Sequence, residues 1–280
     1  MHMQLEDEFG DIISKARIGR GWTSAQLATR MDTSESAIDR IESYRLNPDL
    51  DQIDALAEAL NLNATKLRAI ATGGWTPKQS DPSTELMIIR KVPTSSDTYG
   101  SNAYIIACRR TRMAAVVDPG EGAANIDKAL MEDSLILSNV LVTHTHSDHI
   151  GALTQLLSSH AGVIVSSATI DRDSTMRGVD APWQPADDGF RIDVGEIVVT
   201  AISTPGHTAG STCYRVEGAC FTGDTLFAAS IGRPSRMELY QPMLICIRSK
   251  LLSLPVETIL LPGHGPASTV AQEIEHNPFV

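Results

Sequence analysis

Three histidines and one aspartate lie within six consecutive residues: His144, His146, Asp148 and His149. They follow an apolar run at residues 140–142, which predicts a buried strand that ends where the polar loop begins. Side chains alternate along an extended chain, so His144 and His146 can point into one cavity. Asp148 and His149 lie in the turn that opens the next predicted helix and can surround a neighbouring site. Imidazole and carboxylate groups are metal ligands, and this spacing suits two metal ions rather than one.

Three later segments each place one further candidate ligand beside a glycine at the end of a predicted strand. These ligands are His207 in residues 204–208, Asp224 in residues 221–225 and His264 in residues 261–266. The simpler alternative is a polar surface loop that is rich in histidine by chance. Four uncommon residues in register, followed by three segments of the same kind, favour a metal site over that alternative.

With these motifs the chain resembles the metallo-β-lactamase fold superfamily, and within it the hydroxyacylglutathione hydrolases (glyoxalase II) and relatives such as the persulfide dioxygenases. The resemblance covers about residues 85–280 and includes seven metal-ligand positions in order. It implies a four-layered αββα sandwich, whereas composition alone indicates only the α/β class. The ligand set that it implies is His144, His146 and His207 for one metal ion, Asp148, His149 and His264 for the other, and Asp224 bridging both.

The resemblance implies a binuclear metal-dependent hydrolase, in which hydroxide held by the metal ions attacks a thioester or related small acyl compound. Asp148 is then the catalytic residue that orients the hydroxide and shuttles its proton. Nitrogen and carboxylate ligands without thiolate suit two divalent ions, with zinc first and iron or manganese as alternatives. Asp118, in an Asp-Pro-Gly turn after a predicted strand, is expected either to orient a ligand from behind or only to form the turn.

Two other activities stay open. A mononuclear iron persulfide dioxygenase would need only His144, His207 and Asp224 as ligands. A DNA-binding transcription regulator would use the metal-containing domain to sense a ligand. β-Lactamase activity is not expected, because Asp224 stands where the common zinc β-lactamases carry an arrangement built around a cysteine ligand.

Arg233, Arg236 and Tyr240 follow a Gly-containing loop and are candidate substrate-binding residues. Two arginines near a metal site could hold a substrate carboxylate, although a loop arginine is more often simply solvated. Glyoxalase II enzymes continue with a helical extension that carries glutathione-binding residues, whereas this chain ends at Val280. Binding of a glutathione moiety is therefore not implied, unless Arg233, Arg236 or Tyr240 supply the contacts.

The first seventy residues predict five short helices, because apolar residues recur at helical spacing between capping residues and a break at Asn47-Pro48. Residues 23–42 resemble the helix-turn-helix of the Cro/C1 (Xre) family, which implies DNA contacts by the helix at about residues 34–43. The candidate contact residues are Ser34, Ser36 and Arg40.

The charge of this region speaks against a large nucleic-acid surface. Over residues 1–76, twelve acidic residues outnumber eight basic ones, and a phosphate-binding surface needs the opposite balance. Dimerisation or docking by the module is therefore the alternative to DNA binding.

A segment rich in Gly, Pro and polar residues at positions 72–83 predicts a linker. We accordingly divide the chain into a helix-turn-helix domain (1–72), a linker (73–84) and a metallohydrolase domain (85–280). In the last of these, the patterns predict strands at 86–89, 103–108, 113–117, 140–142, 163–165, 197–202, 213–216, 219–222 and 258–261, and helices at 123–132, 150–160 and 242–252.

The composition is that of a globular protein, with 42% hydrophobic and 20% charged residues among 280. No apolar run approaches the roughly 18 residues that a membrane span requires, and the first residues do not read as an export signal. The four cysteines have no disulfide-like spacing, which is typical of a reduced, cytoplasmic protein. The net charge of −11 argues against a broad nucleic-acid or anionic-membrane surface. We expect a small-molecule acyl substrate, DNA as the second candidate partner, and a homodimer.

Overall fold

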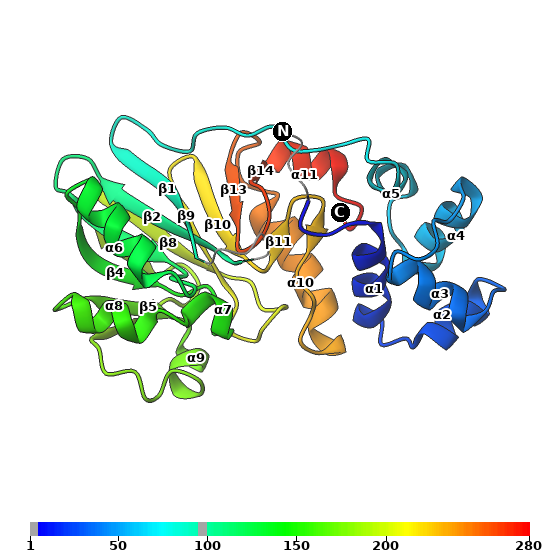
Figure 1. The fold of residues 1–280 in the computed structure, drawn as a ribbon, viewed down its shortest axis with the longest axis horizontal. Helices are drawn as coiled ribbons and strands as arrows, with labels where there is room; N and C mark the ends of the chain where they lie inside the picture. The colour runs from blue at the N-terminus through cyan, green and yellow to red at the C-terminus, as the bar shows by residue number, and fades with distance from the viewer. Residues whose placement is uncertain (1–4, 95–99) are drawn as a thin grey trace.

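The computed structural model of the chain describes residues 5–94 and 100–280 (Figure 1). The N-terminal part consists of α1 (Phe9–Gly19), α2 (Ser24–Arg30), α3 (Glu35–Glu42), α4 (Leu50–Leu60) and α5 (Ala64–Ala71). The starts of α2 to α5 are capped by the side chains of Thr23, Ser34, Asp49 and Asn63. Each cap accepts a hydrogen bond from a backbone N–H in the first turn of its helix, which satisfies a donor that the helix itself leaves unpaired. The five short helices predicted for this part are confirmed.

Two six-stranded mixed sheets form the larger part of the chain. The first sheet runs in the order β1 (Met87–Pro93), β2 (Asn102–Cys108), β3 (Met113–Val117), β4 (Ile136–Leu141), β5 (Ile164–Ser167), β6 (Trp183–Pro185). The second runs in the order β14 (Ser268–Thr269), β13 (Ile259–Pro262), β10 (Ala219–Gly223), β9 (Thr212–Val216), β8 (Ile197–Ser203), β7 (Arg191–Val194). A separate hairpin pairs β11 (Leu226–Phe227) with β12 (Ser230–Ile231).

The two sheets pack face to face, with helices outside them. Buried side chains of both sheets form the core between them, where Tyr104 of β2 meets Phe221 of β10 edge to face at a centroid distance of 5.3 Å. Helices α6 (Ala123–Glu132) and α8 (Leu153–Ser159) cover the outer face of the first sheet. Helix α10 (Tyr240–Cys246), its π-helical continuation η2 (Ile247–Leu251) and α11 (Val270–His276) cover the second. The predicted four-layered αββα sandwich is confirmed.

The N-terminal helices share a hydrophobic core with the second sheet's outer layer, so the two parts form one packed body (Figure 1). Ile12 and Ala16 of α1 belong to the same buried cluster as Ile231 and Met243. The approach is close, because a Cβ atom built on Gly19 of α1 would lie 2.4 Å from the Tyr240 ring. Glycine is therefore needed where α1 crosses the start of α10.

Several elements differ from the sequence prediction. The helix predicted at 150–160 is two helices, α7 (Ser147–Ile150) and α8, because the chain breaks at Gly151-Ala152, where the Ala152 N–H bonds to the Gly120 carbonyl at 2.5 Å. The short strands β6, β7, β11, β12 and β14 and the helices α9 (Thr169–Asp173) and α11 were not predicted. These pieces have two to seven residues, too few for a periodic pattern. Among the described residues, no helix is both long and apolar enough to cross a bilayer.

Candidate metal centre

The first group of predicted ligands lies at the carboxyl ends of β3 and β4. These two strands are parallel neighbours, so the turn after Val117 and the loop after Leu141 meet at one edge of the sheet. Asp118 has a positive φ of 49°, which turns its side chain under the histidine loop. Its carboxylate accepts hydrogen bonds from the Thr143 backbone N–H at 2.8 Å and the Thr143 hydroxyl at 2.6 Å, and one oxygen lies 3.0 Å from Nδ1 of His149. Asp118 thus fixes the ring of His149 from behind and leaves Nε2 free to face the cavity.

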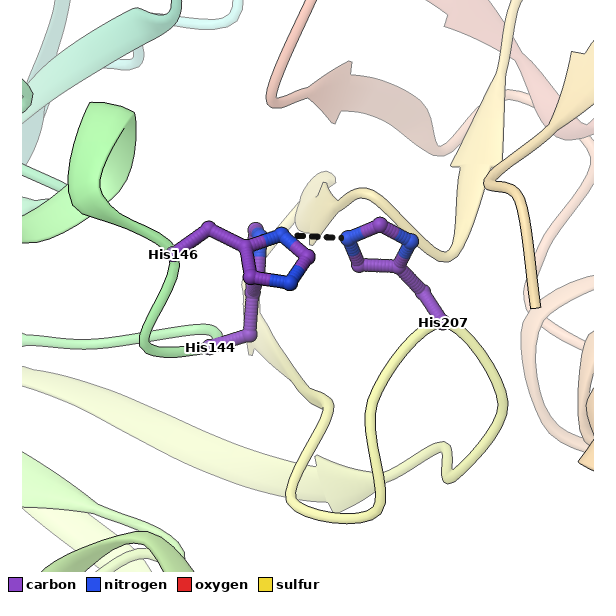
Figure 2. A group of neighbouring side chains, drawn as sticks. All are labelled: His144, His146 and His207. Atoms are coloured by element: carbon purple, nitrogen blue, oxygen red, sulfur yellow. Dashed lines mark hydrogen bonds between the residues drawn. The ribbon is translucent and has the colours of Figure 1, made fainter. Parts of the chain in front are cut away.

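Three imidazoles converge from two loops (Figure 2). Nδ1 of His146 lies 3.1 Å from Nε2 of His144 and 2.9 Å from Nε2 of His207. Only one proton fits between two nitrogens at this distance. In each close pair, therefore, at least one nitrogen carries a lone pair that is directed into the centre. The three ring nitrogens are placed as one set of candidate metal ligands.

A second set faces the first. Nε2 of His149 lies 3.3 Å from Nε2 of His264, and an oxygen of Asp148 lies 3.2 Å from His264 and 3.5 Å from His149. Asp224 stands between the two sets. Its carboxylate oxygens lie 3.9 Å from His144, 3.5 Å from His207, 3.4 Å from His149 and 3.8 Å from His264.

Two buried polar atoms of this centre support occupation by a cation. Within the described part of the chain, Oδ1 of Asp224 and Nδ1 of His264 have no hydrogen-bond partner, although unpaired buried polar atoms are costly. Space is also kept open, since a Cβ on Gly263 would lie 2.3 Å from Oδ1 of Asp224 and 2.6 Å from the His149 ring. The donor set contains only imidazole nitrogens and carboxylate oxygens. These residues fit zinc, iron or manganese.

The pKa shifts match this arrangement. Burial and the neighbouring imidazoles lower the pKa of His144 well below its usual range, so its ring is neutral, as a metal ligand must be. Burial also lowers the pKa of His149, but the hydrogen bond and charge of Asp118, together with Asp224, outweigh burial and raise it to about 9. The hydrogen bond with His264 lowers the pKa of Asp148 well below its usual range. A cation bound beside His149 would therefore displace a proton.

The ligands that come from the second sheet, His207 and His264, have supports that the sequence patterns did not indicate. Nδ1 of His207 donates to the backbone carbonyl of Arg233 at 2.7 Å, and the Phe227 ring meets the His264 ring edge to face at 6.1 Å. Both partners come from the β11–β12 hairpin or the residues after it. A carbonyl carries no sequence signal, whereas Thr143, also missed, was recognisable as the residue directly before His144.

Comparison with known proteins agrees with this geometry. Residues 96–264 match the family described as "Metallo-beta-lactamase superfamily", and residues 13–67 match one described as "Helix-turn-helix". The chain belongs to the metallo-β-lactamase superfamily. The predicted resemblance to that superfamily and to a helix-turn-helix module is thereby confirmed.

Individual known proteins are similar over 62% to 69% of this chain. A hydroxyacylglutathione hydrolase of Alkalilimnicola ehrlichii is 34% identical over 62% of this chain and 63% of its own length. The solved structure of BLEG-1 B3 metallo-beta-lactamase is 30% identical, with a TM-score of 0.60, over 69% of this chain and 99% of its own. The structure of ETHE1 from Myxococcus xanthus is 28% identical, with a TM-score of 0.59, over 69% of this chain and 84% of its own.

The three predicted substrate residues differ in their exposure. Arg233 and Arg236 are exposed in the segment between β12 and η1 (Met237–Leu239). Tyr240 is 2% exposed and packs against Gly19 of α1, within the core shared with the N-terminal helices. Its burial there leaves no surface for a substrate, so the substrate contact predicted for Tyr240 does not follow from its position.

The candidate DNA-contact residues lie around α3. Ser34 caps the helix, while Ser36 and Arg40 are exposed on it. Two further arginines of the module are used internally. Arg17 pairs with Glu42 through two 2.6 Å hydrogen bonds, and Arg20 donates to the Leu60 carbonyl. The charge of Arg17 is therefore balanced within the module, and the guanidinium group of Arg20 is held against the Leu60 carbonyl.

Proposed function

We propose that this chain is a binuclear metal-dependent hydrolase of the glyoxalase II-like group that cleaves a thioester or a related small acyl compound. The observation that carries the proposal is the position of Asp224, whose carboxylate lies 3.4 to 3.9 Å from imidazole nitrogens of both ligand sets. A carboxylate placed in this way can bridge two cations. The hydrolase relative that is 34% identical supports the choice of acyl chemistry.

Bound divalent ions would supply Lewis acidity, lowering the pKa of water from 15.7 to roughly 7 and stabilising negative charge that develops on a substrate carbonyl. His144, His146 and His207 would hold one ion, with zinc our first choice. Asp148, His149 and His264 would hold the other, and the position of Asp224 allows it to serve both.

The side chain of Asp148 has the further role of moving a proton. It is about half exposed, so it reaches solvent as well as the cavity, and its pKa is held low by His264. A carboxylate in this place stays ionised, so it would orient an attacking water through a hydrogen bond and pass a proton on to solvent. Asp118 keeps the acceptor nitrogen of His149 directed at the cavity throughout.

Asp224→Asn tests the proposal. Loss of the shared negative charge should remove about half of the bound metal and lower kcat/KM for a thioester by about 1,000-fold, since several kcal/mol of stabilisation disappear. Metal content and turnover are measured together, in a screen of thioesters, lactones, persulfides and β-lactams. Asp127→Asn is the matched control, because Asp127 also pairs with a histidine, His160, at 2.8 Å on the surface. Unchanged turnover in Asp224→Asn, or no metal in the wild-type protein, would refute the proposal.

A persulfide dioxygenase with one iron ion is the second candidate, favoured by the similarity to ETHE1. It requires His144, His207 and Asp224 alone, so His146→Ala and His264→Ala should keep their iron and their activity. Thiol-dependent oxygen uptake with one iron per chain would support this candidate over the hydrolase.

A DNA-binding role of the N-terminal helices rests on the helix-turn-helix match and the exposure of Ser36 and Arg40. A gel-shift assay with the upstream DNA of the gene, repeated over a range of salt concentrations, tests this role. The absence of a sequence-selective shift would leave docking as the function of these helices.

A further inference from the structure

One lysine of the N-terminal helices is buried beside the metal centre. Lys15 on α1 is 7% exposed and pairs with the buried carboxylate of Asp7. Its ammonium group also donates a 2.8 Å hydrogen bond to the backbone carbonyl of Ile231 and lies 4.7 Å from the centroid of the Phe227 ring. Lys15 therefore contacts both strands of the β11–β12 hairpin, in which Leu226 pairs with Ile231.

The strand that accepts this hydrogen bond, β12, continues into the segment that supports the metal ligand His207. Two residues after Ile231, the carbonyl of Arg233 accepts the 2.7 Å hydrogen bond from Nδ1 of His207. Gly232, the residue between them, packs directly against Asp224 and His207, because a Cβ at this position would lie 1.7 Å from the Asp224 carbonyl oxygen and 3.2 Å from Cβ of His207. A shift of the Ile231 carbonyl would therefore be passed through this close contact to His207 and Asp224.

The other strand of the hairpin leads to a third ligand. Phe227 lies between the Lys15 ammonium group and the His264 ring, at 4.7 Å from the former and a ring separation of 6.1 Å from the latter. A cation over an aromatic face is attracted to it, which fixes the ring. Through its contacts with the hairpin, the Lys15 ammonium group therefore holds the segments that position His207, Asp224 and His264.

We infer that Lys15 is a positioning residue of the metal centre: the N-terminal helix holds the hairpin that orients His207 and Asp224. The inference rests on the proposed metal-binding function. Helix α1 then acts as a structural component of the centre, and metal binding is thermodynamically linked to the docking of α1 on the hairpin. By this linkage, metal that binds more tightly to the docked form also stabilises docking to the same extent.

A second lysine provides the matched control. Lys66 on α5 also joins the N-terminal helices to the catalytic part, donating to the carbonyls of Ile274 at 2.8 Å and Val280 at 2.7 Å. Neither acceptor lies in the β11–β12 hairpin or in the residues that follow it, so Lys66 bears on the metal ligands only indirectly, through α11. An effect of general loosening between the two parts should therefore appear in both lysine variants, whereas an effect of positioning should appear only at Lys15.

The test compares Lys15→Met and Lys66→Met in the full chain by zinc competition with a chelator, and by kcat and KM separately. We expect Lys15→Met to weaken zinc binding by at least about tenfold and to lower kcat more than it raises KM, as for residues that orient metal ligands. Lys66→Met should change zinc affinity less than about twofold, and Lys15→Arg, which keeps the donor, should restore part of the loss. Equal zinc affinity in Lys15→Met and wild type would overturn the inference while leaving the proposed function intact. Failure of the wild-type protein to bind zinc, iron or manganese would overturn both.

Amide hydrogen exchange of the wild-type protein gives an answer even if Lys15→Met does not fold. Adding zinc should slow exchange in α1 and at residues 231–233 without a comparable change in α5. Zinc-induced protection that is absent from α1, or that is equal in α1 and α5, would contradict a positioning role of Lys15.

Discussion

The two halves of the metal centre are supported in different ways. Asp118, His144 and His149 come from the ends of the neighbouring strands β3 and β4, and they are joined by hydrogen bonds within one edge of one sheet. His207 and Asp224 come from separate segments of the second sheet. Their support comes from the residues that follow the β11–β12 hairpin.

The hairpin is in turn held by both ends of the chain. Lys15 of α1 bonds to Ile231. On the other side, the buried Glu273 of α11 bonds to Ala229 at the turn, and Asn277, just after α11, bonds to Ser230 at the start of β12. The first half of the centre is therefore held by hydrogen bonds among residues at one edge of one sheet. The second half depends on contacts that α1 and α11 make with the hairpin. Substitutions far from the ligands should consequently affect the second half alone.

Among substitutions outside the metal ligands, the largest effect should follow from Asp118→Asn, which removes the common support of the first half. The carboxylate accepts from Thr143 twice and faces Nδ1 of His149, and an amide of the same shape has one oxygen fewer to offer. We expect a loss of about 2 to 3 kcal/mol in the free energy of unfolding. Metal affinity should fall by about 10- to 100-fold. Denaturant unfolding and chelator competition measure the two effects; unchanged metal affinity would show that Asp118 only forms the turn.

A smaller effect should follow from Gly232→Ala, which disturbs the second half. The added methyl group would overlap the Asp224 carbonyl, so the segment after β12 must move away from His207. Overpacking of this kind costs about 1 to 3 kcal/mol. Metal affinity should fall by about tenfold, because a displaced carbonyl no longer orients the His207 ring. Gly178→Ala is the control, since nothing lies within 4 Å of a Cβ at that position. Equal metal affinities in the two variants would show that the second half does not depend on this segment.

The same contrast explains what could be predicted from the sequence. His144, His146, Asp148 and His149 are close in the chain, so their spacing indicated a site before any fold was known. The overall sandwich followed from the resemblance that these motifs carry, and the longer strands from their apolar runs. In contrast, the role of the β11–β12 hairpin depends on strands of two residues and on backbone carbonyls. Such features have no periodic pattern and no characteristic side chain.

The sequence patterns likewise did not predict how the N-terminal helices pack against the rest of the chain. Lys15 is a single lysine in an amphipathic helix, for which a solvated position is the ordinary expectation. Only the tertiary packing of α1 on the hairpin buries it beside Phe227. Tyr240 shows the reverse case, because its proximity in sequence to Arg233 and Arg236 suggested a substrate contact, whereas packing against Gly19 buries it.

The smallest effect at the metal centre should come from Glu273→Gln, which alters the hairpin's support from α11. Glu273 is fully buried, and burial raises the pKa of its carboxyl group to about 7, although hydrogen bonds from its neighbours oppose the shift. A carboxyl group whose folded-state pKa is raised stabilises the fold fully below its unfolded pKa of 4.5, and this contribution is lost as pH rises through about 7. Glutamine does not titrate. Between pH 5 and pH 8 the variant should therefore gain roughly 2 to 3 kcal/mol in unfolding free energy relative to wild type.

Denaturant unfolding of both proteins at several pH values measures this change. Because Glu273 bonds to the turn at Ala229 rather than to the strand that leads to His207, metal affinity at a fixed pH should change less than about threefold. A stability difference that is constant with pH would mean that Glu273 keeps its charge, held by the N–H donors of Ala229 and Asn277. A large loss of metal affinity would instead mean that the turn and the strand move together, so that the second half of the centre depends on the C-terminal helix as strongly as on Lys15.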